Sequence, residues 1–363
     1  MISGDPNILD SNSVVGKRIE EYRKVLGELE ILLCKSNFFN FFSGFIKGCK
    51  LLYRKKVDII TAQSPEHWLL AWIFSKIFKI PWQMQIHTDI FSLHFVRSSV
   101  SDKMRVFLAK FLIPRADGIR VVSERIKKSI QELWTMDHKL WNKIVVLPIF
   151  VDVEKIKRFS IKTDLHEKYG KDKFIILMAS RLTKEKNVGL AIDVFKDLLD
   201  SNSSPQPSSL TLREEGGDEM KSHREEGVTP ILLIVGNGPE EKKLKLKTMN
   251  YKLRTNVIFE SWTDDLFSYY KTCDLFLLTS NYEGYGMALV EAAASGARII
   301  SSDVGVAREI LENEAVFKIG DALDLKNKLN VAFLGALPKP KQILQDSKEI
   351  YLTKFKRIFE LCK

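Results

Sequence analysis

The stretch L-F-L-L-T-S-N-Y-E-G-Y-G-M-A-L-V-E covers residues 275–291 and indicates the fold of the chain. Its first four residues are large and apolar, which predicts a buried strand. A polar loop with two glycines follows, and a helix is expected from about residue 287 to 295. A strand that passes through a short glycine loop into a helix is the building unit of open α/β sheets, which bind ligands at such turns.

The same alternation of apolar strand-length runs and amphipathic helical stretches covers nearly the whole chain, which predicts parallel sheets built from βαβ units. In the first half we expect strands at 30–34, 57–62, 82–87, 118–123 and 144–148, with helices at 64–78, 101–111 and 124–133. The pattern restarts in the second half, with strands at 174–180, 231–236, 257–260, 275–280, 298–301 and 316–319. The predicted fold class is therefore α/β, with two Rossmann-like halves.

The length of 363 residues suits two domains, and hence a cleft between them. We expect a first domain at 1–152, a second at 153–345 and a C-terminal helix within 346–363 that returns to the first domain. Residues 201–229 are rich in Ser, Pro, Gly and Glu, which predicts a mobile surface insertion. Residues 1–5 look like only the end of a buried strand, so the chain may begin a few residues late.

Positive charge is concentrated in the first half of the chain. Residues 1–160 contain 26 Lys plus Arg and 16 Asp plus Glu, a net +10, and the remaining residues contain 30 of each (56 − 26 and 46 − 16). The segment from Lys35 to Lys56 combines five phenylalanines with six basic residues and no acid, a composition typical of membrane-surface helices. The alternative is an amphipathic helix that covers the sheet. A nucleic-acid partner is not expected, because no recognition motif accompanies the charge.

The remaining composition indicates a cytoplasmic chain, with possible peripheral attachment to the inner face of the cell membrane. No signal-peptide pattern or bilayer-length apolar run is present. The four cysteines are scattered, without a metal-ligand spacing, so reduced structural thiols and no bound metal are expected. The Asp264–Asp265 pair precedes a predicted helix and is interpreted as a cap instead of a metal-binding pair.

Two glutamates and the glycines between them form the first candidate site. Gly284 and Gly286 would let a phosphate approach the backbone, and the N–H groups at the helix start attract negative charge. Glu291 could accept hydrogen bonds from ribose hydroxyls. On a continuous helix the eight residues from Glu283 to Glu291 would rise about 12 Å. Glycosidase carboxylates lie about 5 to 9.5 Å apart, so this pair suits the two ends of an extended ligand better than one scissile bond.

Two further turns should open on the same edge of the second sheet. Arg181 and Lys186 follow the strand at 174–180, and together they could neutralise a diphosphate and stabilise it as a leaving group. Gly236 and Gly238 follow the strand at 231–236 and should bring backbone close to the same crevice. The third glycine of the dinucleotide fingerprint is missing there, which argues against a nicotinamide or flavin enzyme.

In order and spacing these segments resemble the retaining family 4 glycosyltransferases of the GT-B class. The matching stretches are A-S-R-L-T-K-E-K-N, L-L-I-V-G-N-G-P, V-I-F-E-S-W-T-D-D-L-F-S-Y-Y, N-Y-E-G-Y-G-M-A-L-V-E-A-A-A-S-G and S-S-D-V-G-V-A-R-E-I-L, with looser matches at Q-I-H-T-D-I, A-D-G-I-R-V-V-S-E-R and V-L-P-I-F-V-D. Ser180 and Ser261 stand where that family usually has glycine. Gly4 and Gly16 are uncertain counterparts of its first glycine loop.

The resemblance implies a role for each matching residue. Arg181 and Lys186 would hold the donor diphosphate, Glu291 the ribose and Glu283 the hydroxyls of the transferred sugar. His87 would reach the donor sugar from the first domain, and Asp89 or Asp152 would border the site. The donor would also contact the loop backbones, at Gly284, Tyr285, Gly286, Met287, Gly236 and Gly238.

The implied function is transfer of a hexose from a nucleoside-diphosphate sugar, with retention of configuration, to a glycan or lipid-linked acceptor in the synthesis of cell-envelope polysaccharide or glycolipid. No cofactor is implied beyond the nucleotide sugar itself. A GT-B epimerase, a phosphorylase or a non-catalytic sugar-nucleotide-binding protein would use the same pocket. Neither the base, the sugar nor the acceptor can be identified from these residues.

Overall fold

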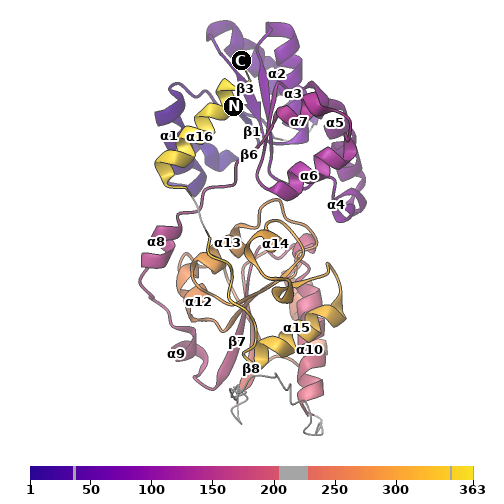
Figure 1. Ribbon diagram of the computed structural model, residues 1–363, viewed down its shortest axis with the longest axis vertical. Helices are drawn as coiled ribbons and strands as arrows, with labels where there is room; N and C mark the ends of the chain where they lie inside the picture. Colours follow the sequence, from indigo (N-terminus) through magenta and orange to yellow (C-terminus); the bar gives the residue numbers. More distant parts are fainter. Residues whose placement is uncertain (36–37, 204–227, 344–345, 363) are drawn as a thin grey trace. The chain divides into compact units, whose positions relative to one another are not determined.

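The computed structural model describes residues 1–363 except 36–37, 204–227, 344–345 and 363 (Figure 1). The chain forms two compact units, one of Met1–Phe150 with Gln345–Lys363 and the other of Val151–Leu344. Each unit contains a six-stranded parallel sheet, which confirms the predicted pair of Rossmann-like halves. The insertion expected at 201–229 falls almost entirely outside the described residues.

The sheet of the first unit has the strand order β2-β1-β3-β4-β5-β6. Its strands are β1 (Ile2–Ser3), β2 (Leu32–Leu33), β3 (Ile60–Ala62), β4 (Trp82–Ile86), β5 (Gly118–Val121) and β6 (Ile144–Val146). The predicted strands are all present but shorter than expected. β1, of which the sequence showed only an end, pairs with both β2 and β3.

Helices cover both faces of this sheet. Its helical segments are η1 (Pro6–Leu9), α1 (Val14–Leu26), α2 (Phe38–Arg54), α3 (Pro65–Phe78), α4 (Leu93–Ser98), α5 (Val100–Leu112), η2 (Ile113–Arg115), α6 (Glu124–Leu133), α7 (His138–Asn142) and α16 (Lys348–Glu360). Helix α3 packs between α2 and α5 on one face, while α1 and α16 pack together on the other (Figure 1). The Tyr22 and Phe355 rings stack at 4.0 Å in the core between α1 and α16.

The sheet of the second unit has the order β12-β11-β10-β7-β8-β9. Its strands are β7 (Lys173–Ala179), β8 (Thr229–Val235), β9 (Val257–Glu260), β10 (Leu275–Leu278), β11 (Ile299–Ser302) and β12 (Val316–Phe317). Its helical segments are α8 (Val153–Arg158), α9 (Leu165–Tyr169), η3 (Lys184–Lys186), α10 (Val188–Ser203), α11 (Glu241–Asn250), α12 (Leu266–Thr272), α13 (Met287–Ala294), α14 (Ala307–Ile310), η4 (Asn313–Ala315) and α15 (Ala322–Phe333).

The central strands of the second sheet are apolar on both faces, as expected for a parallel sheet covered by helices on each side. All four residues of β10 are buried, as are the last five of β7 and of β8. Because every strand is parallel, the loops after β7, β8, β10 and β11 leave the sheet at the same edge. This edge carries the candidate site of the second unit.

Candidate functional site

The loops that follow β7 and β10 lie side by side, because these two strands are neighbours in the sheet. The Thr279 hydroxyl donates to the carbonyls of Lys186 and Asn187, at 3.0 and 3.1 Å. The Asn281 amide donates to the Glu185 carbonyl at 2.7 Å. Asn187 adopts a left-handed conformation and its side-chain amide donates to the Asn281 side chain at 3.1 Å. These bonds hold the turn at residues 181–187 against the loop at residues 279–286.

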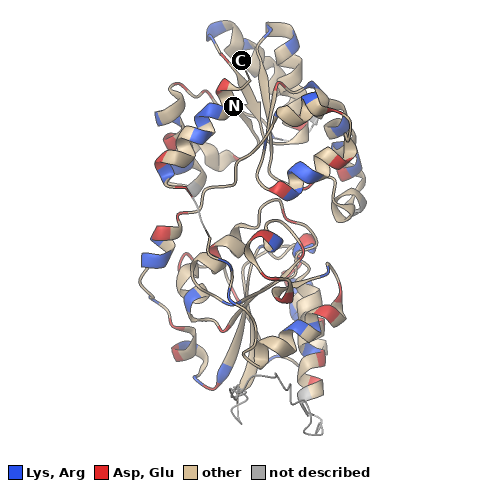
Figure 2. Ribbon diagram, viewed as in Figure 1, with Lys and Arg blue, Asp and Glu red and all other residues tan. Residues whose placement is uncertain are grey.

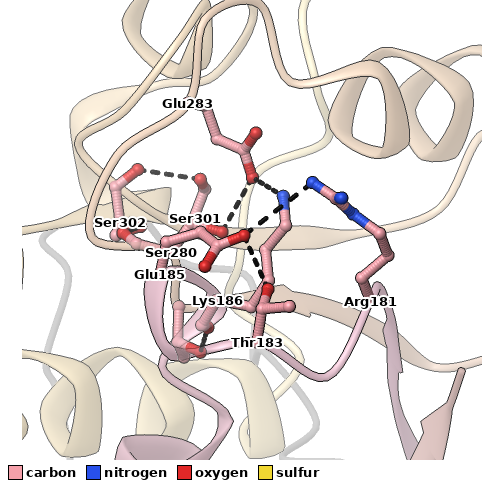
Figure 3. Close-up of polar contacts among 9 residues, drawn as sticks. Arg181, Thr183, Glu185, Lys186, Ser280, Glu283, Ser301 and Ser302 are labelled. Carbon is pink, nitrogen blue, oxygen red and sulfur yellow. Dashed lines mark hydrogen bonds and ion pairs between the residues drawn. The ribbon is translucent and has the colours of Figure 1, made fainter. Parts of the chain in front are cut away.

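Lys186 and Glu283 form an ion pair across these two loops. The Lys186 Nζ lies 2.5 Å from the Glu283 Oε1, and the Ser280 hydroxyl donates to the same oxygen at 2.8 Å (Figure 3). Only 17% and 14% of the two side chains are exposed. The structure therefore brings together two of the predicted site residues, and each places its charged group at the carboxyl edge of the sheet.

Arg181 lies on the same turn but is largely free of protein contacts. Its side chain is 79% exposed, and its guanidinium lies 3.8 Å from the Glu185 carboxylate. Glu185 is held in place by the Thr183 hydroxyl, which donates to it at 2.6 Å. Figure 3 shows the Arg181 contact with Glu185 and the Lys186 contact with Glu283 as separate ion pairs of the same turn. Two cations therefore reach the same edge, one paired and fixed, the other exposed.

Glu291 lies in α13 with its carboxylate mostly buried. Burial raises the pKa of Glu291 to about 7. The nearby Tyr270 hydroxyl is buried and has no hydrogen-bond partner among the described residues, and its pKa is raised first by burial and then by the charge of Glu291. A carboxylate in such a place gains from ligand hydroxyls that donate to it, because these replace the water lost on burial.

Beyond Glu283, the last part of the loop between β10 and α13, at residues 284–286, contributes backbone and no exposed side chain to the site. Gly286 is the N-cap of α13 at φ 91°, a conformation that favours glycine, and as a glycine it contributes no capping side chain. The Tyr285 side chain is only 7% exposed. The Tyr285 carbonyl accepts from the Val306 amide at 3.0 Å. Any ligand contact of Tyr285 is thus expected from its backbone.

Gly236 and Gly238 allow the loop after β8 to pack closely against the backbone of the loop after β7. A Cβ added at Gly236 would lie 1.9 Å from the Ser180 carbonyl oxygen, and one at Gly238 would lie 2.3 Å from the Leu182 carbonyl oxygen. The Leu182 amide also donates to the Asn237 carbonyl at 2.9 Å. These glycines therefore position the turn that carries Arg181, a use that the spacing alone did not indicate.

His87 lies in the first unit, directly after β4. Burial lowers the pKa of His87 to about 3, with smaller contributions from the charges of Arg120 and Arg18. Its Nε2 is 3.4 Å from the Gln85 Oε1. His87 is therefore neutral across the physiological pH range, so its ring has one nitrogen that donates a hydrogen bond and one that accepts. Asp89, which is buried, also belongs to the first unit, and the predicted diphosphate, ribose and sugar contacts other than His87 belong to the second.

Other predicted features have different roles from those expected. Asp265 occupies the N-cap position of α12, but its carboxylate accepts from the Ser268 hydroxyl at 2.6 Å instead of a backbone amide. Gly16 lies within α1, where a Cβ would be 1.8 Å from the Asp10 carbonyl oxygen, so it allows η1 to pack on α1. Within the described parts of the chain, no cluster of three or more His, Cys, Asp or Glu is placed to hold a metal ion.

Sequence reasoning missed the supporting residues of this edge. Thr279, Ser280 and Asn281 link the two loops, and Ser302 donates to the Ser280 carbonyl at 2.7 Å. Gly305, at φ 52°, lies so close to the Tyr285 carbonyl that a Cβ would be 2.4 Å from it. These residues end predicted strands or follow them, so the rule that ligands bind at the carboxyl ends of strands could have indicated them.

Comparison with known families gives matches over both units. Residues 161–349 match the family described as glycosyl transferases group 1, and residues 19–155 match glycosyltransferase family 4. The first match alone covers more than half of the chain. The chain therefore belongs to the glycosyl transferases group 1 family.

Two curated relatives have named activities. The alpha-monoglucosyldiacylglycerol synthase of Streptococcus pneumoniae is 25% identical over 272 residues, which is 72% of this chain and 55% of that protein. The UDP-Gal:alpha-D-GlcNAc-diphosphoundecaprenol alpha-1,3-galactosyltransferase of Escherichia coli is 25% identical over 272 residues, which is 73% of this chain and 62% of that protein. The matched region thus spans between about half and two thirds of each relative's length.

Solved structures support the fold. Anabaena HepE in complex with UDP and glucose has a TM-score of 0.63 at 17% identity, with 96% of this chain and 84% of that chain covered. The sucrose-phosphate synthase of Thermosynechococcus elongatus has a TM-score of 0.64 at 18% identity, with 93% and 76% covered. Together with the two parallel six-stranded sheets, these matches confirm the GT-B fold class.

Proposed function

We propose that this protein is a retaining glycosyltransferase that moves a hexose from a nucleoside-diphosphate sugar to a glycan or lipid-linked acceptor. The observation that carries the proposal is the fixed pair of Lys186 and Glu283 at the carboxyl edge of the second sheet, on the loop that leads into α13. Membership of the glycosyltransferase family supports it. Two cations and a helix N-terminus at one edge suit a diphosphate that gains charge as it leaves.

The proposed reaction exchanges one bond for another at the anomeric carbon. The bond to the donor diphosphate breaks, and the acceptor oxygen attacks from the same face, so the configuration is retained. The acceptor proton passes to the departing phosphate oxygen. Lys186 and Arg181 stabilise the charge on the leaving diphosphate, while Glu283 accepts hydrogen bonds from hydroxyls of the sugar. His87, which is neutral, accepts or donates a hydrogen bond at the donor sugar.

The donor's ribose is assigned to Glu291. Burial raises the pKa of its carboxyl group to about 7. Two ribose hydroxyls that donate hydrogen bonds to it would stabilise the ionised form. The amides between residues 284 and 287 contact the phosphates. The loops of Gly236 and Gly238 contribute mainly by holding the Arg181 turn in place. The proposed contacts of residues 284–287 with the donor are therefore made by their backbone.

We assign an anionic membrane surface as a partner of the first unit. Phe42, Ile46 and Tyr53 of α2 are 58%, 67% and 80% exposed, and α5 adds a stripe of exposed apolar side chains at Val100 (82%), Met104 (59%), Phe107 (66%) and Phe111 (37%). Basic positions lie on both helices (Figure 2). The exposed cations among them are Lys47, Lys50, Arg54, Lys103 and Lys110.

Apolar side chains beside lysines are what an interfacial helix presents to anionic lipid. Because α3 packs against both α2 and α5 on one face of the sheet, the two stripes belong to one surface of the unit. In the described part of the chain, no helix is long and apolar enough to cross a bilayer. Contact at the membrane surface would bring the protein to a lipid-linked acceptor.

A panel of nucleoside-diphosphate sugars tests the proposed function. The protein is incubated with each donor, with and without an alkyl-linked sugar acceptor, and release of nucleoside diphosphate is measured. Transfer or slow hydrolysis of at least one donor is expected. Conversion of the donor sugar without release would identify an epimerase instead, and a thermal shift without any turnover would identify a binding protein.

A further inference from the structure

A second polar site lies within the first unit, between the sheet and α1. A cavity of about 150 Å³ is lined there by residues from the carboxyl ends of three strands. Ser3 ends β1, Gln63 follows β3 and His87 follows β4, while α1 contributes Arg18. The strand order reverses at β1, which has β2 on one side and β3 on the other. Open parallel sheets bind ligands at such a switch point.

Arg120 lines this cavity as a buried cation without a counter-ion. It is 2% exposed. Its guanidinium donates to four neutral oxygens at 3.0 to 3.1 Å, namely the carbonyls of Leu147 and Pro148, the Gln85 side chain and the Tyr351 hydroxyl. Among the described residues it has no carboxylate partner. Buried charges in proteins are normally paired, so this site lacks an anion.

Arg18 is the second cation of the lining. It is half-buried on α1, and no ion pair forms between it and any described residue. The carboxylate in the lining is that of Asp5, whose Oδ1 accepts from the Asn7 amide at 3.0 Å. His87 adds no charge, because burial and the two arginines lower its pKa to about 3. The lining is therefore net positive, with two guanidiniums against one carboxylate.

We propose that this cavity binds a phosphate-type oxyanion between Arg18 and Arg120, with His87 beside it. The cavity is several times the ~30 Å³ that one water occupies, so it admits a phosphate group. Guanidiniums bind phosphate oxygens through charge-assisted hydrogen bonds. The anion is carried either by the acceptor or by free phosphate, and the binding does not require that the proposed transfer reaction occur.

The test uses His87 as a reporter in the full-length protein. Histidine is labelled with ¹⁵N, the His87 ring signals are assigned with His87→Asn, and inorganic phosphate is added at constant ionic strength. Saturable shifts of the His87 signals are expected. Arg18→Gln should weaken the phosphate affinity by about tenfold or more, since a charge-assisted contact is lost. Arg23→Gln is the matched control, because Arg23 lies on the same helix and pairs with Glu20 at the surface.

Two further experiments test where phosphate binds and which molecule carries the anion. Lys186→Ala should leave the His87 shifts unchanged, which excludes an effect of phosphate bound in the second unit. An alkyl-diphosphate-linked sugar that shifts His87 at lower concentration than phosphate assigns the site to the acceptor, and a response to phosphate alone assigns it to the free anion. An unresponsive His87, or an Arg18→Gln protein that binds phosphate as the unaltered protein does, would overturn the proposal.

Discussion

At the scale of single residues, the two charged groups of the Lys186–Glu283 pair neutralise each other while no donor is bound. The pair is mostly buried and held by Ser280, so its geometry is set before a ligand arrives. Each partner can then turn to a different part of the donor, the amine to phosphate and the carboxylate to sugar hydroxyls. Arg181, exposed on the same turn, needs to be ordered by the ligand and contributes its charge only then.

Glu291 should give the protein a pH-dependent stability. Its pKa is about 7 in the folded state against 4.5 in the reference state, so between these values the folded protein binds more protons than the unfolded one. Stability therefore falls as pH rises through this range, by about 3 kcal/mol at most. Glu291→Gln should raise the melting temperature at about pH 8 and have little effect at about pH 4.5.

The control for this measurement is Glu314→Gln, which alters an exposed carboxylate in the same unit. Thermal unfolding is followed by circular dichroism at both pH values. A Glu291→Gln protein that gains no stability over the control at high pH would show that the carboxylate is well solvated. Nucleotide affinity in the unaltered protein should rise with pH through 7, because only the ionised carboxylate accepts two hydroxyl donors.

The sequence predicted the residues of this edge better than their environments. Arg181, Lys186 and Glu283 could be selected because they follow predicted strand ends, and Glu291 because it lies in the next predicted helix. The ion pair between Lys186 and Glu283 could not, since it depends on the order of β10 beside β7, and strand order is a property of the whole sheet. The burial of Tyr285 was equally hidden, because it depends on the turn at Gly305.

At the scale of elements, short glycine-containing loops fix the site. The loop after β8 packs backbone on backbone against the loop after β7, and this contact is possible only where Cβ atoms are missing. From sequence, Gly236 and Gly238 were predicted to bring backbone close to the donor crevice. Their observed use is structural, because pattern alone cannot distinguish a glycine that admits a ligand from one that admits a neighbouring loop.

Gly236→Ala should destabilise the second unit strongly. The added Cβ would lie 1.9 Å from the Ser180 carbonyl oxygen, so the Arg181 turn has to move. We expect a loss of at least about 3 kcal/mol in the free energy of unfolding, measured by denaturant titration. Gly296→Ala, also at positive φ but with open space around it, should cost only about 1 to 2 kcal/mol. Equal losses in the free energy of unfolding for the two variants would show that the Arg181 turn can move to accommodate the added Cβ.

The exposed stripes of α2 and α5 should bind anionic vesicles. Lys47→Gln with Lys50→Gln removes two charges near the surface, each worth about 1 kcal/mol, so vesicle affinity should fall about 30-fold. Phe107→Ser should also weaken binding, because its side chain is 66% exposed and available to the lipid. Met136→Ser is the control, since Met136 is 87% exposed outside these helices. Co-sedimentation that is unaffected by salt and by all variants would exclude this surface.

At the scale of the whole molecule, the chain is two compact units, the first of which is completed by the last helix. Five of the six tryptophans, namely Trp68, Trp72, Trp82, Trp134 and Trp141, belong to the first unit. Tryptophan fluorescence therefore reports mainly on that unit, whereas circular dichroism reports on both. The division into two sheets was predictable from the repeated βαβ pattern, whereas for β1 the sequence showed only the end of a strand.

Phe355→Ala should destabilise the first unit and not the second, so that the unfolding transitions of the two units become distinguishable. Phe355 is 2% exposed and stacks on Tyr22, so its truncation should cost the first unit about 3 to 5 kcal/mol. The fluorescence transition should shift, and part of the circular dichroism signal should stay in place. Phe276→Ala, in the core of the second unit, should have the converse effect. Identical shifts in both signals would mean that the units unfold as one.

The central claim is that Lys186 stabilises the departing nucleoside diphosphate. The most direct measurement compares turnover of the best donor by the unaltered protein, by Lys186→Ala and by Lys184→Ala, which removes an exposed lysine from the same turn. We expect kcat to fall on the order of 100-fold or more for Lys186→Ala and to stay within about threefold for Lys184→Ala. A Lys186→Ala protein that turns over within about threefold of the unaltered protein would contradict the account.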